Sequence, residues 1–174
     1  MMLRISQKTV ALLALFILLP LVPAHAQVES ASVVVEGMSC PFCAFGVEKR
    51  LKKVQGVGSI EVNMGVGSAS MTASEGESID FSSIPEAIRK AGFTPGAIDV
   101  TAAGTVSAEN EERTLLKVSG SDQELLLVNL SKEIEKKIAE FAEVGMRMRI
   151  NGVLHFHSDE VPALEPNSVE AIEP

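Results

Sequence analysis

The chain contains two cysteines, Cys40 and Cys43, in the stretch "GMSCPFC". With two residues between them, both sulfur atoms can face a common point. The second cysteine enters an expected helix, and the unpaired N–H groups at a helix start favour a thiolate, the form that binds metal or attacks disulfides. This spacing suits a metal clamp or a redox pair. A purely structural bridge is the weaker reading, because so short a loop constrains little of the unfolded chain.

Soft thiolates select soft metal ions, so the pair favours Cu(I) and, by the same chemistry, Hg(II). Zinc would need two further ligands that no nearby residue provides. The redox alternative is a thiol–disulfide oxidoreductase using the "CPFC" dithiol. Such an enzyme requires a βαβ context around the motif, whereas a hairpin is expected after the first helix. We therefore expect metal binding and no enzyme activity.

The first part of the chain predicts the order β-α-β-β-α-β, the ferredoxin-like arrangement. A β-branched run predicts a strand over 31–37, and apolar residues at i, i+4 and i+7 predict a helix over 41–54, with Gly56 beyond its end. Alternation predicts a hairpin of strands 57–63 and 67–73. A second helix would be capped by Ser82 or Ser83 and end at Gly92. The stretch "FTPGAIDVT" would follow as a proline-interrupted edge strand.

The composition changes near Gly104, where we place a domain boundary. A strand near 104–108, two further strands, a helix capped by Ser131 and two final strands are expected beyond it. That order is the order of an OB-fold, and the alternative is an irregular β-rich extension. The predicted fold class is α+β, with segments 1–26 (signal peptide), 27–103 (metal-binding domain) and 104–174 (small β-barrel domain with one helix).

Residues 1–26 have the features of a cleavable signal peptide: Arg4 and Lys8, an apolar run over 10–22, and small residues before position 27. The alternative is an uncleaved anchor. Cleavage would give a soluble, exported or periplasmic protein without stable membrane insertion, which we expect to be a monomer. Removing these two cations from 15 basic residues leaves 13 against 23 acidic, a net charge of about −10. Nucleic acid is therefore a poor partner.

The stretch "GMSCPFC", followed by Val47, Leu51, Val54, the "GV" at 56–57 and "KAGF" at 90–93, resembles the heavy-metal-associated (HMA) domain of copper chaperones, copper-ATPase modules and periplasmic mercury-binding proteins. The resemblance covers about residues 31–100. It implies that Cys40 and Cys43 bind one Cu(I) or Hg(II) ion per chain and pass it to a metal-transporting ATPase or another carrier protein. It also implies that Met38 is a core residue. The bulky "PF" between the cysteines and the phenylalanine at 93 depart from the family pattern.

Other residue pairs suggest weaker sites. Met146 and Met148 alternate with arginines, which is typical of a core face, although thioethers can bind Cu(I). His155 and His157 would share the solvent side of one strand without a third ligand. A basic cluster contains Lys49, Arg50, Lys52 and Lys53. It is either the solvent-exposed face of a helix or a docking surface for an acidic partner. A further alternative is a metal-sensing adaptor that acts through the β domain.

Overall fold

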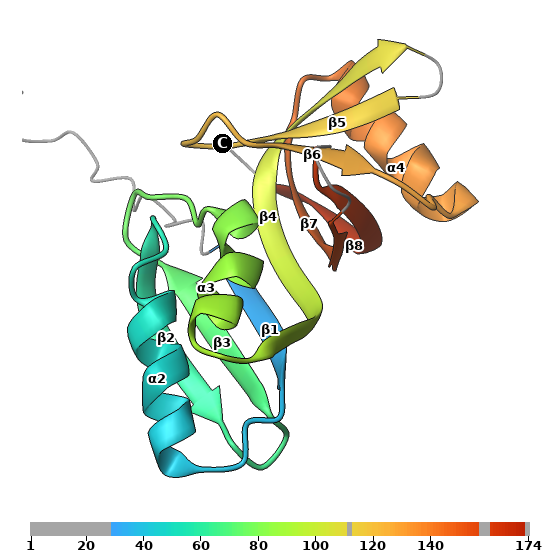
Figure 1. Ribbon diagram of the computed structural model, residues 1–174. Helices are drawn as coiled ribbons and strands as arrows, with labels where there is room; N and C mark the ends of the chain where they lie inside the picture. Colours follow the sequence, from blue (N-terminus) through green and yellow to red (C-terminus); the bar gives the residue numbers. More distant parts are fainter. Residues whose placement is uncertain (1–28, 111–112, 157–160, 173–174) are drawn as a thin grey trace, which may run out of the picture.

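The computed structural model describes residues 29–110, 113–156 and 161–172 (Figure 1). Its first part contains one sheet with the strand order β2-β3-β1-β4, in which every pair is antiparallel. Figure 1 shows both helices of this part on one face of that sheet. This is the predicted ferredoxin-like order, built from β1 (Ser30–Glu36), α2 (Pro41–Leu51), β2 (Val57–Asn63), β3 (Ser68–Ala73), the 3₁₀ turn η2 (Phe81–Ser83), α3 (Ile84–Lys90) and β4 (Thr94–Asn110).

The predicted buried faces of this part are confirmed. Val47 and Leu51 of α2 are fully buried, and Val54 just beyond the helix is 7% exposed. Gly56 follows with a φ of +78°, and a Cβ there would lie 1.9 Å from the carbonyl oxygen of Ser78. Both observations require glycine at the turn into β2. Ser83 occupies the N-cap position of α3, as predicted, but its side chain makes no capping hydrogen bond there. The preceding turn η2 is capped by Asp80, which accepts from the Ser82 amide.

Strand β4 is longer than predicted and runs without interruption through Gly104. The predicted strand 93–101 and the predicted strand near 104–108 are one element. Its first residues pair with β1, residues 98–104 also pair with β7, and residues 104–110 pair with β5. The prediction of an edge strand is therefore wrong for the element as a whole. It holds only around Pro95, where β4 has β1 as its partner and the pairing with β7 has not begun.

The second part is β-rich with one helix, and its strands pair in a closed ring: β4 with β5, β5 with β6, β6 with β8, β8 with β7, and β7 with β4. All of these pairs are antiparallel except β6 with β8. The helix lies between the third and fourth strands of the ring in chain order. The elements added to β4 are β5 (Arg113–Val118), β6 (Glu124–Leu127), α4 (Lys132–Glu143), β7 (Arg147–His155) and β8 (Ala163–Ile172).

Close backbone contacts inside the ring are made possible by two glycines. A Cβ on Gly104 would lie 2.1 Å from the carbonyl oxygen of Lys117, and one on Gly152 would lie 2.2 Å from that of Glu165. The predicted helix is α4, which packs against β8, β4 and β7 with Ile138 buried. The hydroxyl of Ser131 caps it by accepting from the Ile134 amide at 3.3 Å.

The two parts share one hydrophobic core cluster, which contains residues such as Leu51 and Phe81 from the first part and Leu116 and Met148 from the second. Polar contacts also join them. Gln123, in the turn between β5 and β6, donates from Nε2 to the Ile79 carbonyl oxygen at 2.9 Å, and its Oε1 accepts from the Phe81 amide at 3.0 Å. The first part is thus held against the ring by both packing and hydrogen bonds.

The predicted signal peptide, residues 1–26, lies outside the described residues. Within the described ranges, no helix combines the length and apolar character that crossing a bilayer requires.

Candidate metal-binding loop

The cysteine loop connects β1 to α2 at one end of the first sheet. Gly37 leaves β1 with a φ of +85°, and Met38 turns into the core with 5% of its surface exposed. The core prediction for Met38 is therefore confirmed. Cys40 has an extended backbone and occupies the N-cap of α2, while Pro41 takes the first helical position, where a missing N–H costs nothing.

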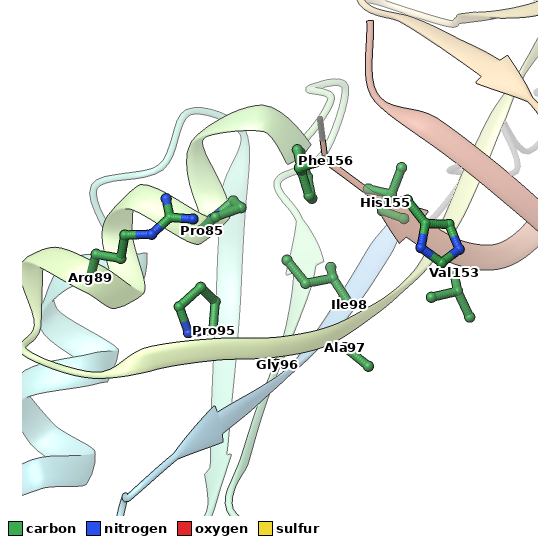
Figure 2. A pocket seen from close by; sticks show the side chains of 10 residues that line it. Pro85, Arg89, Pro95, Gly96, Ala97, Ile98, Val153, His155 and Phe156 are labelled. Atoms are coloured by element: carbon green, nitrogen blue, oxygen red, sulfur yellow. The ribbon is translucent and has the colours of Figure 1, made fainter. Parts of the chain in front are cut away.

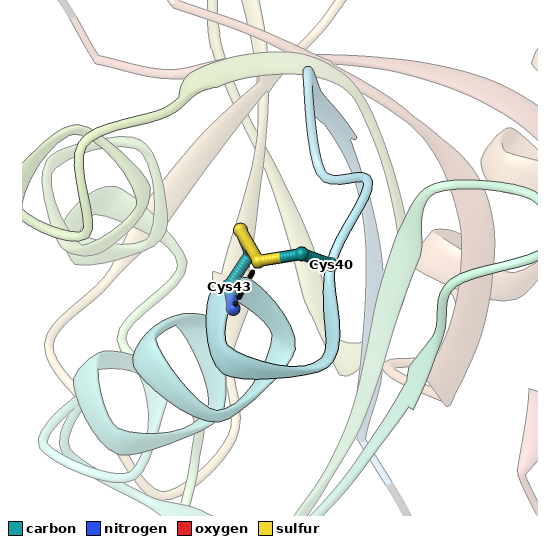
Figure 3. Close-up of a disulfide and its surroundings, with 2 residues drawn as sticks. All are labelled: Cys40 and Cys43. Atoms are coloured by element: carbon teal, nitrogen blue, oxygen red, sulfur yellow. Dashed lines mark hydrogen bonds between the residues drawn. A yellow bond between two sulfur atoms is a disulfide. The ribbon is translucent and has the colours of Figure 1, made fainter.

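The structure brings the two predicted ligands together. Cys40 and Cys43 form a disulfide across a Cα–Cα distance of 5.1 Å, as Figure 3 shows. The backbone amide of Cys43 donates to Cys40 Sγ at 3.2 Å and also to the Cys40 carbonyl oxygen at 3.0 Å. In this oxidised form the two sulfur atoms are bonded to each other, and neither is a thiolate, the form that binds a metal ion. Metal binding by this pair therefore requires two-electron reduction to two thiols.

The local electrostatics favour negative charge on the sulfur atoms. Both cysteines lie in the cap and first turn of α2, where the helix dipole and the unpaired amides favour anions. The first turn holds no acidic residue, and Lys49 and Arg50 lie in the last turn. After reduction, an amide donor that already points at Cys40 Sγ would stabilise a thiolate there.

The aromatic residues near the loop occupy different positions. Phe93 is partly buried against the core, so the residue that departs from the family pattern serves packing. Phe42 is 89% exposed and Phe45 is 65% exposed. Since Phe42 contacts so little of the protein, it does not cover the sulfur atoms. The helix period places Phe45 on the side opposite Val47 and Leu51, so its exposure was readable from the sequence.

The other predicted candidate residues do not converge on a metal site. Met148 is fully buried, as expected of a core residue, and Met146 is half-buried just before β7. His155 is exposed, and its Nε2 lies 3.3 Å from Glu165 Oε2. His157 lies outside the described residues. Within the part of the chain that is described, no group of three or more His, Cys, Asp or Glu side chains could hold an ion.

The basic cluster lies beside a hollow between the two helices of the first part. Lys49, Arg50 and Lys53 line this hollow of about 340 Å³, together with Lys90 of α3. Lys52 points elsewhere and pairs with Glu48 at 2.5 Å. The cluster is exposed to solvent, and Gly46 of α2 and Ala91 just after α3 complete the lining of the hollow.

A second hollow, of about 400 Å³, lies where α3, β4 and β7 meet. Figure 2 shows Arg89 and Pro85 on one side, Pro95 and Ile98 of β4 below, and Phe156 opposite Pro85. Neither cysteine lines it. It has an apolar floor and one guanidinium at its rim, and nothing in the sequence indicated it.

A buried carboxylate was also missed from the sequence. Glu29 is 3% exposed, and it accepts from the Ser78 hydroxyl at 2.7 Å and from the Ile79 amide at 3.2 Å. Burial raises the pKa of this carboxyl above its ordinary value of 4.5, and these hydrogen bonds oppose the shift. No motif marks it, because its environment is created by residues some fifty positions away in the chain.

A ferredoxin-like module with a Cys-x-x-Cys pair at the start of its first helix has the form of a metal-binding domain, and the comparisons identify the family of this part. Residues 32–94 match the family model of the heavy-metal-associated domain. The copper-exporting P-type ATPase of Bacillus subtilis (strain 168) is 35% identical over 69 residues. The matched segment is 40% of this chain and 8% of the ATPase, so the chain spans a small fraction of that relative.

Two solved structures are similar over the same part. Oxidized MerP from Ralstonia metallidurans CH34 is 25% identical, with a TM-score of 0.36 and coverage of 40% of this chain and 94% of MerP. The CopZ metallochaperone is 31% identical, with a TM-score of 0.35 and coverage of 38% of this chain and 98% of CopZ. On the family match and the geometry of the loop, residues 32–94 form a heavy-metal-associated domain. Membership in this family supports metal binding and transfer in general.

Proposed function

We propose that this protein binds one soft metal ion, Cu(I) or Hg(II), through the thiolates of Cys40 and Cys43 and passes it to another carrier, without catalysing a reaction. The observation that carries the proposal is the placement of both sulfur atoms at the start of α2, close enough to form a disulfide, within a matched heavy-metal-associated domain. Copper is also supported by the names of the similar ATPases. Mercury rests on the preference of thiolates for soft ions.

Transfer would proceed by ligand exchange. Reduction of the disulfide consumes two electrons and two protons and releases two thiols. Each thiol loses its proton when it binds the ion, since the thiolate is the ligand. An incoming thiolate of the acceptor can then bind the two-coordinate ion before one cysteine departs, so each step keeps the ion coordinated. We assign the acceptor role to a metal-transporting ATPase or another carrier protein.

We also propose the location and the domain organisation. A signal peptide over 1–26 would direct export to the periplasm or beyond, as a monomer. The metal-binding domain would span 27–103 and the second domain 104–174, with β4 shared between them because its residues 98–104 pair with β7. For the second domain we propose an OB-fold, supported by the closed ring of five strands, the parallel contact of β6 with β8, and the position of α4 between β6 and β7.

Native mass spectrometry of the reduced protein tests the metal proposal. Titration with Cu(I), Hg(II) and Zn(II) in separate samples should give one Cu(I) or Hg(II) ion per chain. The double variant Cys40→Ser, Cys43→Ser should retain neither ion, whereas His155→Ala should bind as the original chain does. Equal uptake by the double serine variant would refute the proposal.

The disulfide itself supports a second candidate, a thiol–disulfide oxidoreductase. An insulin-reduction assay separates the two functions. Robust turnover that is lost in Cys43→Ser would favour the redox enzyme, and absence of turnover together with metal uptake would favour the carrier. A third candidate, a metal-sensing adaptor, would show metal uptake without transfer to any thiolate acceptor.

A further inference from the structure

The end of the molecule that carries the cysteine loop also carries a cluster of exposed apolar side chains. Phe42 and Phe45 extend from the first two turns of α2, with 89% and 65% of their surfaces exposed. Met64 and Val66, in the turn between β2 and β3, are 47% and 71% exposed. These four side chains, which we call the apolar tip, are more than half of the large exposed apolar side chains among the described residues.

The two turns lie next to each other. The Val35 amide, at the end of β1 that leads into the cysteine loop, donates to the Gly67 carbonyl oxygen at 2.7 Å. Figure 1 shows the start of α2 and the β2–β3 turn together at the end of the molecule farthest from the second part. Exposed apolar groups gathered in this way mark an interaction site, since scattered single residues would need no explanation.

Positive charge lies behind the apolar tip along the same face of α2. Phe42, Phe45 and Lys49 follow one another at i, i+3 and i+7, which places them in one stripe of the outer face of α2. Lys53 lies just beyond the end of α2 and lines the same hollow as Lys49. At about 1.5 Å per residue, Lys49 lies roughly 10 Å behind Phe42 along the helix axis. Among the residues that the structure describes, no ion pair fixes Lys49, Arg50 or Lys53, in contrast to Lys52, which pairs with Glu48.

The basic residues lie behind the apolar tip along the axis of α2. This offset between charge and apolar surface favours a lipid surface over a protein partner. A protein interface surrounds its apolar centre with a polar rim in roughly the same plane. A bilayer instead places its acyl boundary about 5–10 Å below the headgroup phosphates, which is the separation between the aromatic and basic residues here. Glu36, exposed at the end of β1, and the net charge of about −10 oppose binding. The attraction is local, because Lys49, Arg50 and Lys53 lie together behind the apolar tip.

We propose that the apolar tip docks on an anionic lipid surface. Phe42 and Phe45, with Met64 and Val66 beside them, enter the acyl boundary, and Lys49, Arg50 and Lys53 meet the phosphates. Docking holds the cysteine loop at the membrane surface. This function does not depend on which metal ion the loop binds, or on metal binding at all.

A single tryptophan reports this docking, because the chain contains none. Phe42→Trp is placed in the chain that starts at Gln27, which retains every described residue and lacks the apolar run over 10–22. Vesicles of phosphatidylcholine with roughly one-third phosphatidylglycerol should shift its emission to the blue, and brominated lipid should quench it. Val144→Trp, at the 69% exposed end of α4, is the matched control and should do neither.

Further substitutions in the Phe42→Trp chain test the contributions of the apolar tip and of the basic residues separately. Phe45→Ser in the Phe42→Trp chain should weaken vesicle binding by at least about tenfold, and Lys49→Glu with Lys53→Glu should weaken it by a similar factor and remove the salt dependence. All of these side chains are exposed, so folding should be unaffected. An unchanged Phe42→Trp emission would overturn the proposal. So would equal quenching of Val144→Trp, binding that survives the charge reversal, or a blue shift without vesicles that grows with protein concentration and identifies a second copy as the occupant.

Discussion

Replacing Gly104 with alanine should destabilise the protein, because this residue lies where β4 has neighbours on both sides. It pairs with Val118 of β5 and with Met148 of β7. An added Cβ would lie 2.1 Å from the Lys117 carbonyl oxygen and 3.1 Å from Leu116 Cδ1. Because a real Cβ contact is not shorter than 3.0 Å, β5 must move by about 1 Å. Overpacking of this kind costs about 1–3 kcal/mol of unfolding free energy.

Urea and thermal unfolding measure this loss. For a chain of this size, a cost of about 2 kcal/mol should lower Tm by about 4–8 °C. Gly46→Ala is the matched control: this helical glycine has nothing within 4 Å of its added Cβ, and the same change should raise stability by about 0.5–1 kcal/mol. A Gly104→Ala protein that unfolds at the original urea concentration and temperature would refute the argument from close approach.

Two further predictions concern buried polar groups. Burial raises the pKa of Glu29, so the folded state favours its protonated form, and the unfolding free energy should fall as pH rises from about 4.5 through that raised value. Glu29→Gln should flatten this part of the pH profile in urea unfolding, whereas exposed Glu75→Gln should not, and parallel profiles would contradict the assignment. Gln123→Ala removes both hydrogen bonds to the backbone around Phe81 and should cost about 1–3 kcal/mol by the same assay. Asp122→Ala, an exposed neighbour, should cost little, and equal losses in the two variants would argue against the proposed link.

Local patterns predicted the elements of the fold well. The spacing of Val47 and Leu51 defined the buried face of α2, because a helix that packs on a sheet repeats its apolar residues with the helical period. Alternation likewise identified Met148 as a core residue of β7. These signals come from neighbours in the chain and require no knowledge of the partner element.

Long-range partners were not predictable in the same way. Pro95 indicated an edge strand correctly for its own position, but no local signal announces that β7 joins β4 three residues later. The small, polar stretch after Thr101 was interpreted as a domain boundary. Small residues are also what a strand needs where its backbone closely approaches two neighbouring strands. Gln123 and Glu29 gave no signal, since their roles depend on backbone groups far along the chain.

The candidate site was more predictable than the fold around it. Two cysteines at this spacing lie close together whatever the rest of the fold is, and the residues that position them are their sequence neighbours. The docking surface proposed for the apolar tip needed the structure, because it joins the first turn of α2 to a hairpin turn about twenty residues later.

The continuity of β4 has a consequence for any attempt to divide this molecule. Cutting the chain at Gly104 would divide β4 and remove its first half from the closed ring of strands. The strand β7 would then lose the partner that it pairs with over residues 98–104 of β4. The released sheet would present fresh, unsatisfied backbone at its rim, a known route to aggregation. Fragments prepared to study the metal loop alone should therefore extend past this strand. Otherwise their behaviour will reflect the lost strand pairing and not a property of the loop.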